Sequence, residues 1–391
     1  MNRSDQLDYD VAIIGGGIHG VGVAQVAAAA GYRAIVIESR ALAAGTSCRS
    51  SKLIHGGLRY LETLQVGLVR ESLTERERLL RIAPSLVRRQ PFLIPVYPKT
   101  KRRPWQLHLG LTGYWLLAGL KPQTGYRQIP RDQWETLDGL TTRELTHVFQ
   151  YWDAQTDDRL LTEAVMRSAQ SLGAELVCPA EFQQATLIEQ GVELQIQHGD
   201  TQRTITARTL VNAGGPWATQ VAQQISPQPP TPSVDLVAGT HLELPGKVEH
   251  GCYYVEAPQD GRAVFVMPWY DRTLLGTTER VQRDDPSNVP ATDAEVEYLL
   301  AVYRHYFPGR STQVLDRWAG LRVLPAATGA AFKRSRETQL PTDNDAQPRV
   351  LSIFGGKLTG YRATAEKVLA KLRPSLPTAT PRGDTRTLPL E

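Results

Sequence analysis

The sequence has little cysteine, and its cysteines form no pattern. Only three of its 391 residues are cysteines, Cys48, Cys178 and Cys252, and they lie far apart. They make neither a CxxC pair nor the spacing of a zinc site. We therefore expect a reducing compartment and no metal site.

Long apolar runs are absent as well. The chain has no uninterrupted apolar stretch of about 18 residues, so we expect no segment that spans a bilayer. The first residues, MNRSDQLDYDVAIIGGG, show no apolar run before a small-residue cleavage site. This argues against a signal peptide, and with the cysteine usage it predicts a cytoplasmic protein.

Charge of one sign is not in large excess. The chain has 44 Lys and Arg residues against 40 Asp and Glu residues, a net charge of +4. This excess is too small to indicate a nucleic-acid partner, and we expect none. A local basic cluster can still serve a membrane surface or an anionic substrate.

Length and overall composition are those of a soluble two-domain protein. The chain is 41% hydrophobic and 21% charged, which is ordinary for soluble proteins. Its 391 residues exceed the roughly 250–300 residues at which a single core stops growing.

A nucleotide-binding pattern opens the chain. Residues 8–14 (DYDVAII) predict a buried parallel strand, residues 15–20 (GGGIHG) fit GxGxxG, and an Ala-rich helix ends near Gly31. A second strand follows at residues 33–38 and ends in Glu38. Such glycines permit a tight turn, the helix N-terminus faces a pyrophosphate, and the acid accepts from a ribose hydroxyl. The alternative, a glycine turn needed only for packing, leaves Glu38 as a coincidence.

Residues 46–62 (TSCRSSKLIHGGLRYLE) have the composition of a site, with hydroxyls, Lys52, His55, a Gly-Gly step, Arg59 and Tyr60 together. Unpaired polar groups are costly in a core, whereas loops on a rigid scaffold carry binding chemistry. The next segment, residues 67–82, alternates Glu and Arg. It predicts a helix with a solvated face supported by i,i+4 pairs and no function.

Residues 99–120 (KTKRRPWQLHLGLTGYWLLAGL) place four basic residues before a short segment rich in Trp, Tyr and Leu. The segment is too short to span a bilayer but suits lying in its interface, with Trp105, Tyr114 and Trp115 as anchors. A buried hydrophobic helix after a charged loop is the alternative.

The middle of the chain predicts a return to the nucleotide domain. Residues 158–172 predict a helix with Asp158 as its N-cap, and residues 175–177, 186–197 and 204–210 predict strands. The strand end VNAGGPW at residues 211–217 allows close approach to a cofactor, and the Pro-rich residues 226–232 predict a linker.

The remainder predicts a second, antiparallel domain and a final return. Residues 234–324 alternate like strands, with a hairpin at 263–278 and a helix at 293–306. A strand at 349–354, a Gly-Gly step and a helix through Leu372 then rejoin the first domain. The tail, residues 374–391, is Pro- and Thr-rich and is expected to be loosely ordered.

The fold class expected from these patterns is α/β plus antiparallel β, a discontinuous Rossmann-like dinucleotide-binding domain with a mainly antiparallel-sheet second domain. The family resemblance described below implies that the first is an FAD-binding domain and the second a substrate domain. We assign residues 1–90, 145–232 and 325–391 to the first and residues 91–144 and 233–324 to the second. One dinucleotide motif favours a cofactor that stays bound. With FAD there, no second fold for a nicotinamide cofactor is evident, so electrons leave to a quinone, a protein or oxygen.

Several cationic residues near Gly-rich turns suit an anionic substrate. Arginine recognises phosphate or carboxylate in a bidentate manner, although any single one can equally be a surface ion pair worth under about 1 kcal/mol. The candidates are Lys52, Arg59, Arg322, Arg336 and Lys357.

Five blocks of sequence resemble the FAD-dependent glycerol-3-phosphate dehydrogenases, which belong to the D-amino-acid-oxidase-like flavoproteins. The blocks are residues 15–20, 50–62 (SSKLIHGGLRYLE), 211–217, 264–279 (VFVMPWYDRTLLGTTE) and 352–362 (SIFGGKLTGYR). The resemblance implies oxidation of sn-glycerol 3-phosphate to dihydroxyacetone phosphate, reduction of FAD, and electron transfer to membrane quinone. The usual bacterial enzyme continues into a C-terminal helical domain, which we expect to be absent here.

The resemblance also implies roles for particular residues. Those expected to hold FAD are Gly15, Gly17, Gly20, Glu38, Thr46, Ser47, Ser51, Lys52, Leu53, Gly214, Gly356 and Leu358. Those expected to line the substrate site are His55, Arg59, Tyr60, Arg322, Arg336 and Lys357. Arg322 and Arg336 are the expected phosphate partners, with Arg334 as a rival to Arg336. His55 is the proton acceptor by residue type, with Tyr60 and Lys357 as alternatives.

Family members with a membrane role carry a basic-aromatic segment like residues 99–120. This implies a peripheral position on the inner face of the cell membrane. Two other functions stay open. One is a related oxidoreductase acting on another anionic hydroxy acid or amino acid, and the other is a flavin-binding protein that has lost turnover.

Overall fold

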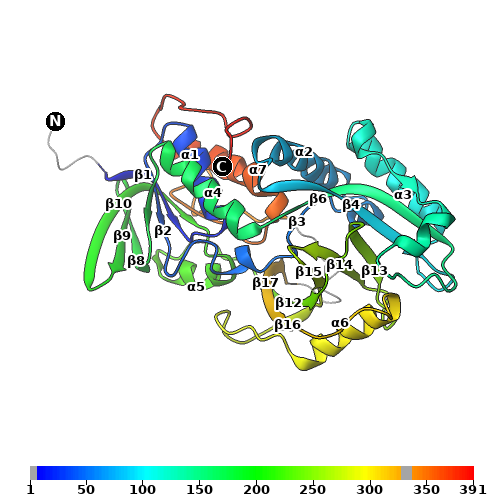
Figure 1. Ribbon diagram of the computed structural model, residues 1–391. Helices are drawn as coiled ribbons and strands as arrows, with labels where there is room; N and C mark the ends of the chain where they lie inside the picture. The colour runs from blue at the N-terminus through cyan, green and yellow to red at the C-terminus, as the bar shows by residue number, and fades with distance from the viewer. Residues whose placement is uncertain (1–6, 327–336) are drawn as a thin grey trace.

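Two β-sheets organise the computed structural model, which describes residues 7–326 and 337–391 (Figure 1). The first sheet has eight strands in the order β11-β8-β9-β10-β1-β2-β7, with β18 beside β10. The second has ten strands in the order β16-β12-β15-β14-β13-β4-β6-β3, with β17 beside β12 and β5 beside β6. The predicted fold class, α/β plus antiparallel β, is confirmed.

The first sheet combines a parallel layer with an antiparallel meander. β1, β2, β7 and β18 pair in parallel with their neighbours, and β8, β9 and β10 pair antiparallel. The predicted single run at 186–197 is in fact two strands separated by a turn. The bounds are β1 (Tyr9–Ile14), β2 (Ala34–Ile37), β7 (Glu175–Val177), β8 (Glu181–Ile188), β9 (Gly191–His198), β10 (Thr201–Asn212), β11 (Ile225–Ser226) and β18 (Val350–Ser352).

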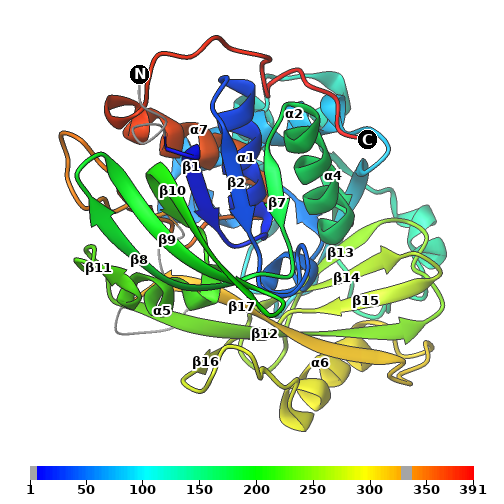
Figure 2. The same ribbon diagram turned by 90° about the vertical axis from the view of Figure 1, so that its left-hand side faces the viewer.

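The parallel strands are buried on both faces, which explains their continuous apolar sequence. Val11 and Ile13 of β1 pack into the cluster that contains the helices, whereas Ala12 and Ile14 pack with the meander. The helices are α1 (Ile18–Ala29), α4 (Asp158–Ser171) and α7 (Tyr361–Leu372). Figure 2 shows them together on one side of the sheet.

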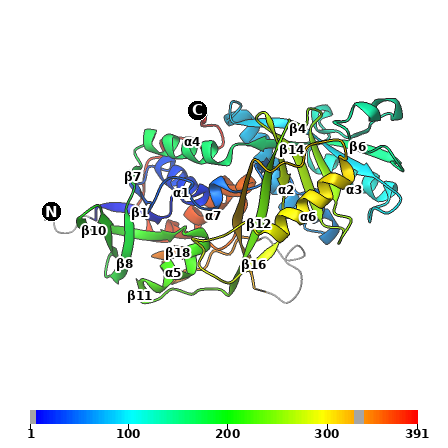
Figure 3. The same ribbon diagram turned by 60° about the horizontal axis from the view of Figure 1, so that its bottom comes forward.

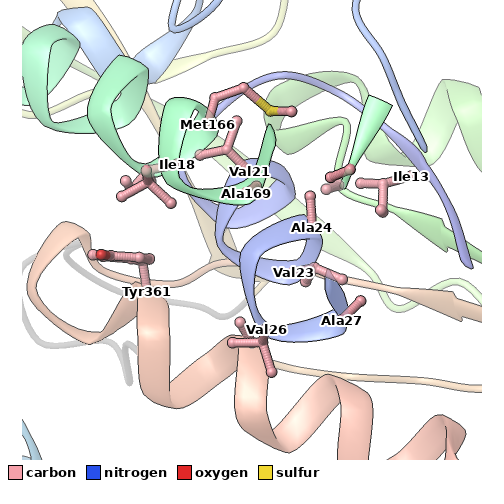
Figure 4. Close-up of a cluster of buried hydrophobic side chains, with 14 of the residues drawn as sticks. Ile13, Ile18, Val21, Val23, Ala24, Val26, Ala27, Met166, Ala169 and Tyr361 are labelled. Carbon is pink, nitrogen blue, oxygen red and sulfur yellow. The ribbon is translucent and has the colours of Figure 1, made fainter. Parts of the chain in front are cut away.

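Helix α1 is enclosed on all sides, as Figure 4 shows. It lies between Met166 and Ala169 of α4 and Tyr361 of α7. A Cβ atom at Gly22 would lie 2.8 Å from the Tyr361 ring, so a glycine is required for this close approach. Enclosure explains why the helix is apolar around its circumference.

The second sheet is antiparallel except where β13 pairs with β4. Its bounds are β3 (Leu53–Ile54), β4 (Val87–Val96), β5 (Arg127–Gln128), β6 (His147–Thr156), β12 (Val234–Pro245), β13 (Cys252–Glu256), β14 (Ala263–Trp269), β15 (Arg272–Gly276), β16 (Arg280–Gln282) and β17 (Asp316–Pro325). The sheet therefore takes β6 and β3 from segments that the predicted division gave to the cofactor domain. The hairpin β14–β15 forms as predicted.

Helices cover both faces of this sheet. Helix α6 (Asp293–Tyr306) has the predicted bounds and packs across one face, as Figure 3 shows. Helix α3 (Pro104–Leu117) packs on the other face, with α2 (Val66–Ile82) beside it. Along β14, Val264 and Val266 point to the α6 side, while Phe265 and Met267 point to the α3 side.

The charged helix α2 does not match its predicted solvated face. Glu75 and Arg76 are 1% and 0% exposed. Arg76 pairs with Asp153 of β6, and Glu75 pairs with Arg362 of α7. The prediction was wrong because these charges find partners distant in sequence.

The tail also differs from its prediction of loose order. The Arg382 amide donates to the Ala29 carbonyl oxygen at 2.7 Å, and the Leu390 amide donates to that of Ile82, also at 2.7 Å. The Leu390 side chain is buried in the first core. In the part of the chain that the structure describes, no helix combines the length and apolar character needed to cross a membrane.

Candidate cofactor and substrate site

A cavity of about 820 Å³ lies where the two sheets meet. Its wall includes the glycine loop after β1, the ends of β2 and β10, parts of β12 and β17, and the loop between β18 and α7. Its volume is within the roughly 300–1,000 Å³ typical of ligand sites. Carboxyl ends of parallel strands are the usual place for a nucleotide.

The glycine loop has the geometry that close cofactor approach requires. Gly15 has φ +108°, and a Cβ atom there would lie 2.6 Å from the Ala213 carbonyl oxygen. Gly15 and Gly17 line the cavity. Gly20 is not among the lining residues, and a Cβ atom there would lie 1.9 Å from the Gly15 carbonyl oxygen. Gly20 therefore serves the packing of loop against helix.

Glu38 stands at the end of β2 and lines the same cavity. One carboxylate oxygen accepts from the Gly16 amide at 2.7 Å and the other from the Arg40 amide at 2.8 Å. These bonds fix the carboxylate beside the glycine loop, in the position that the nucleotide pattern requires of an acid that accepts from ribose.

The segment after Gly45 connects helix α1 with the second sheet. Ser47 Oγ accepts from the Ile18 amide at the start of α1. Thr46 Oγ1 donates to the Leu321 carbonyl oxygen of β17 at 2.8 Å, and Ser51 Oγ lies 2.9 Å from His241 Nε2 of β12. The first half of the segment is therefore fixed to α1 and to the second sheet at the cavity wall.

Lys52 does not line the cavity, in contrast to its neighbours Ser51 and Leu53. Its ammonium group is buried, 2.6 Å from Asp158 Oδ1 and 2.6 Å from the Cys48 carbonyl oxygen. Asp158 also accepts from the Ser50 amide. The N-cap of α4 is Asp157, so the prediction of Asp158 in that role was wrong. The buried pair holds the loop in shape.

A cationic and aromatic cluster occupies another part of the wall. Lys357 Nζ lies 3.9 Å from the centroid of the Tyr60 ring, and Arg59 lies 6.0 Å from it. The His55 amide donates to Thr359 Oγ1 at 3.0 Å, which joins the two segments that carry the cluster. Arg322 approaches from β17, with Nη1 2.9 Å from Glu279 Oε1.

Fifteen of the predicted site residues line this single cavity. They are Gly15, Gly17, Glu38, Thr46, Ser47, Ser51, Leu53, His55, Arg59, Tyr60, Gly214, Arg322, Gly356, Lys357 and Leu358. Gly20 and Lys52 lie behind the wall. Arg336 and its rival Arg334 lie outside the described residues. Among those described, no group of His, Cys, Asp and Glu side chains is arranged to hold a metal ion.

Two histidines of the wall were missed by sequence reasoning. Burial, with Arg322 and Lys52 nearby, lowers the pKa of His241 to about 3, and burial lowers the pKa of His19 to about 4. Both imidazoles are therefore neutral near pH 7. His241 is a polar residue within an apolar strand, which is a weak signal. His19 occupies a variable position of the GxGxxG pattern, so nothing in the sequence marks it as a site residue.

Gly356 gives a direct test of the cofactor site. It has φ +112°, and a Cβ atom there would lie 2.1 Å from His19 Nε2. We expect Gly356→Ala to weaken FAD binding by roughly ten- to a hundredfold, from about 1–3 kcal/mol of strain. Flavin fluorescence titration of the apoprotein measures this. Gly360→Ala is the matched control, because nothing lies within 4 Å of its added Cβ. Equal affinity in both variants would contradict a cofactor at this wall.

The cavity has what a flavin dinucleotide needs. A glycine loop at a helix N-terminus, an acid at the end of β2, a second glycine loop before α7 and a closing antiparallel sheet surround it. Together these features define an FAD-dependent oxidoreductase.

Comparison with known families supports the assignment to the FAD-dependent oxidoreductases. A family model described as FAD dependent oxidoreductase matches residues 10–356. The chain belongs to this family, and FAD is its cofactor. Within it, the chain groups with the glycerol-3-phosphate dehydrogenases.

Three relatives illustrate this placement. A glycerol-3-phosphate dehydrogenase of Pseudomonas aeruginosa is 36% identical over 376 residues, 94% of this chain and 72% of the relative. A D-erythritol 1-phosphate dehydrogenase of Brucella abortus is 34% identical, over 94% of this chain and 74% of the relative. The structure of glycerol-3-phosphate dehydrogenase from Bacillus halodurans complexed with FAD superposes with a TM-score of 0.74 at 26% identity, covering 99% and 68% of the two chains.

Proposed function

We propose that this enzyme oxidises sn-glycerol 3-phosphate to dihydroxyacetone phosphate and passes the electrons to a membrane quinone. One observation carries the proposal. Lys357, Arg59 and Arg322 come from three distant segments and line one cavity beside the second glycine loop. Such convergence suits a small substrate with a dianionic group.

The chain's own residues divide the work between binding and proton transfer. The two glycine loops and Glu38 would hold FAD, which would supply the acceptor for a hydride from the carbinol carbon of the substrate. Lys357, Arg59 and Arg322 bind and orient the phosphate, and Arg336 is proposed as a further partner. The hydroxyl proton goes to a base, for which His55 is proposed. Tyr60 and Lys357 are the alternatives.

Anaerobic mixing of the purified yellow holoenzyme with glycerol 3-phosphate tests the substrate. Stopped-flow absorbance should show bleaching of the oxidised flavin, and glycerol without phosphate should reduce it far more slowly. A flavin that stays yellow with glycerol 3-phosphate removes the substrate assignment. A flavin-binding protein that has lost turnover, the other alternative, would stay yellow with every compound.

A second candidate substrate is D-erythritol 1-phosphate. A relative with that named activity matches as much of this chain as the glycerol-3-phosphate dehydrogenases do. Both compounds are polyol phosphates, so the same cations suit both. Comparison of flavin reduction rates at equal concentration separates them. Faster reduction by a non-phosphorylated hydroxy acid or amino acid would support the broader alternative.

The quinone acceptor is tested separately from the substrate. After anaerobic reduction, addition of a soluble quinone analogue should restore the yellow flavin within a turnover time. Restoration by oxygen alone, with no response to the quinone, would instead make the enzyme an oxidase.

We propose further that α3 and the turn after it lie on the cytoplasmic surface of the cell membrane. Trp105, Leu109 and Leu116 are 64%, 69% and 60% exposed, and Leu120 is also exposed. Tyr114 does not match its predicted role as an anchor, because it is buried and bonds to Asp153. Exposed apolar residues beside Lys99, Lys101 and Arg103 suit an anionic interface.

Removal of two exposed apolar side chains should weaken membrane binding. We expect Trp105→Ser combined with Leu109→Ser to reduce co-sedimentation with anionic liposomes at least tenfold, because each side chain loses about 1.5–3 kcal/mol of burial. Leu315→Ser, an exposed leucine elsewhere in the fold, is the control. Unchanged sedimentation of the double variant would show that α3 does not face the bilayer.

A further inference from the structure

The Gly56-Gly57 turn carries the substrate-binding half of the segment that begins at Thr46. His55 precedes the turn, and Arg59 and Tyr60 follow it. The Gly56 amide donates to Tyr114 Oη at 2.8 Å and to Asp153 Oδ1 at 3.2 Å. A Cβ atom at Gly56 would lie 2.4 Å from that hydroxyl oxygen. The turn is thus tied directly to α3 and β6.

Asp153 is the centre of this attachment. Its carboxylate is buried, accepts from Arg76 Nη1 at 2.6 Å, and accepts from Tyr114 Oη at 2.8 Å. Burial, reinforced by the Asp153 carboxylate, raises the pKa of Tyr114 well above its ordinary value. The hydroxyl therefore stays protonated and donates. With the Gly56 amide, the Arg76 guanidinium and the Tyr114 hydroxyl as its three donors, the Asp153 carboxylate has one preferred geometry.

The neighbouring residue of α2 makes an equally buried contact in another direction. Glu75 accepts from Arg362 in a bidentate manner, with both N–O distances 2.8 Å. Both side chains are almost fully buried. Arg362 lies in the first turn of α7, just beyond the segment with Lys357 and Thr359.

Adjacent residues of a continuous helix have a fixed relative position. Through Arg362, Glu75 therefore fixes the start of α7, which follows Lys357 closely in the chain. Through Asp153, Arg76 fixes the strand β6 to which the Gly56 turn is bonded. We propose that Glu75, Arg76, Asp153 and Tyr114 form a positioning unit that sets the distance between Lys357 and the Arg59–Tyr60 segment. The proposal deepens the proposed function and rests on it, because those residues are assigned to substrate there.

Stability alone is a poor reason for so many buried charges. Buried ion pairs contribute little net stability, and hydrophobic replacements of similar volume are often at least as stable. A small error in position, in contrast, can lower an enzymatic rate about 10²-fold. The unit joins the two segments on which substrate binding depends, so the geometry points to positioning.

Tyr114→Phe tests the unit with minimal change in volume. Its matched control is Tyr253→Phe, which removes a hydroxyl that donates to Asp138 at 2.7 Å from an equally buried ring. We expect both variants to lose similar thermal stability. Only Tyr114→Phe should speed hydrogen exchange at the Gly56 amide, by tenfold or more, and raise the KM for glycerol 3-phosphate roughly tenfold with a smaller change in kcat.

Glu75→Gln extends the test to the α7 side of the unit. It keeps the shape of the side chain and removes its charge, and a rise in KM with retained FAD content is again expected. The exchange measurement needs no substrate, so it reports on the unit even if glycerol 3-phosphate fails to reduce the flavin. Identical exchange and KM effects in Tyr114→Phe and Tyr253→Phe would overturn the proposal.

Discussion

Replacement of Lys357 by methionine should lower kcat/KM for glycerol 3-phosphate by roughly 10²–10³-fold while FAD stays bound, a loss equivalent to about 3–4 kcal/mol. The ammonium group lies 3.9 Å from the centre of the Tyr60 ring, at a cavity wall with Arg59 and Arg322. A substrate phosphate at this wall gives up hydrogen bonds to water and gains charged donors in their place. Without the Lys357 ammonium group, the remaining donors no longer offset the cost of removing the phosphate from water. Methionine keeps the length of the side chain, which limits any packing effect.

Lys367→Met is the matched control for this result. Lys367 lies on α7, is largely exposed and pairs with Glu71 on the surface. Surface pairs of this kind contribute about 0–1 kcal/mol, so activity should be unchanged. If Lys357→Met retains full kcat/KM while Arg322→Met loses it, the phosphate lies on the Arg322 side of the cavity only.

The second large effect is expected at the buried pair behind the flavin-side loop. Lys52→Met leaves the Asp158 carboxylate buried without its cation, and we expect about 3–5 kcal/mol lower stability. Thermal unfolding of the holoenzyme, with FAD content measured in parallel, provides the reading. The double variant Lys52→Met/Asp158→Asn removes the uncompensated charge and should recover most of the loss. A double variant that is as unstable as the single one would mean that packing, not charge, dominates.

The same variant should show a characteristic pH dependence. Burial raises the pKa of Asp158, and the Lys52 ammonium opposes that rise. Without Lys52 the folded-state pKa rises further above the unfolded value. At low pH the carboxyl is neutral in both states, so the missing cation does not reduce the free energy of unfolding. That free energy falls as pH rises from the unfolded-state pKa of Asp158 through its folded-state pKa. The difference in melting temperature between wild type and Lys52→Met should therefore be smaller at pH 5 than at pH 8.

Local patterns in the sequence were enough for much of the fold and for part of the site. The glycine loop, Glu38 and the hairpin β14–β15 are encoded by residues close together in the chain, so their spacing alone predicts them. The same holds for α6, whose predicted bounds match the structure, because Thr292 and Glu295 form a capping box at its start. Contacts within a few residues need no knowledge of tertiary structure.

Contacts between distant residues were the ones that sequence reasoning missed. Lys52 was assigned to the cofactor, but its partner Asp158 is on α4 in another part of the chain. Arg76 was read as solvated although it follows Leu73 and precedes Leu79 at helical spacing, within the apolar stripe of α2. A charge in such a stripe is a signal for a buried pair. The identity of its partner is a tertiary fact that spacing cannot supply.

The position of the last parallel strand has a consequence for biosynthesis. β18 pairs beside β10, and the Gly355-Gly356 loop that follows it meets His19 of the first glycine loop. The cavity wall therefore joins two glycine loops that lie far apart in the chain and are synthesised at different times. Because domains begin to fold during synthesis, the segments before β18 are made while this wall is still incomplete. Full flavin binding is therefore expected only once β18 and the loop that follows it have joined β10.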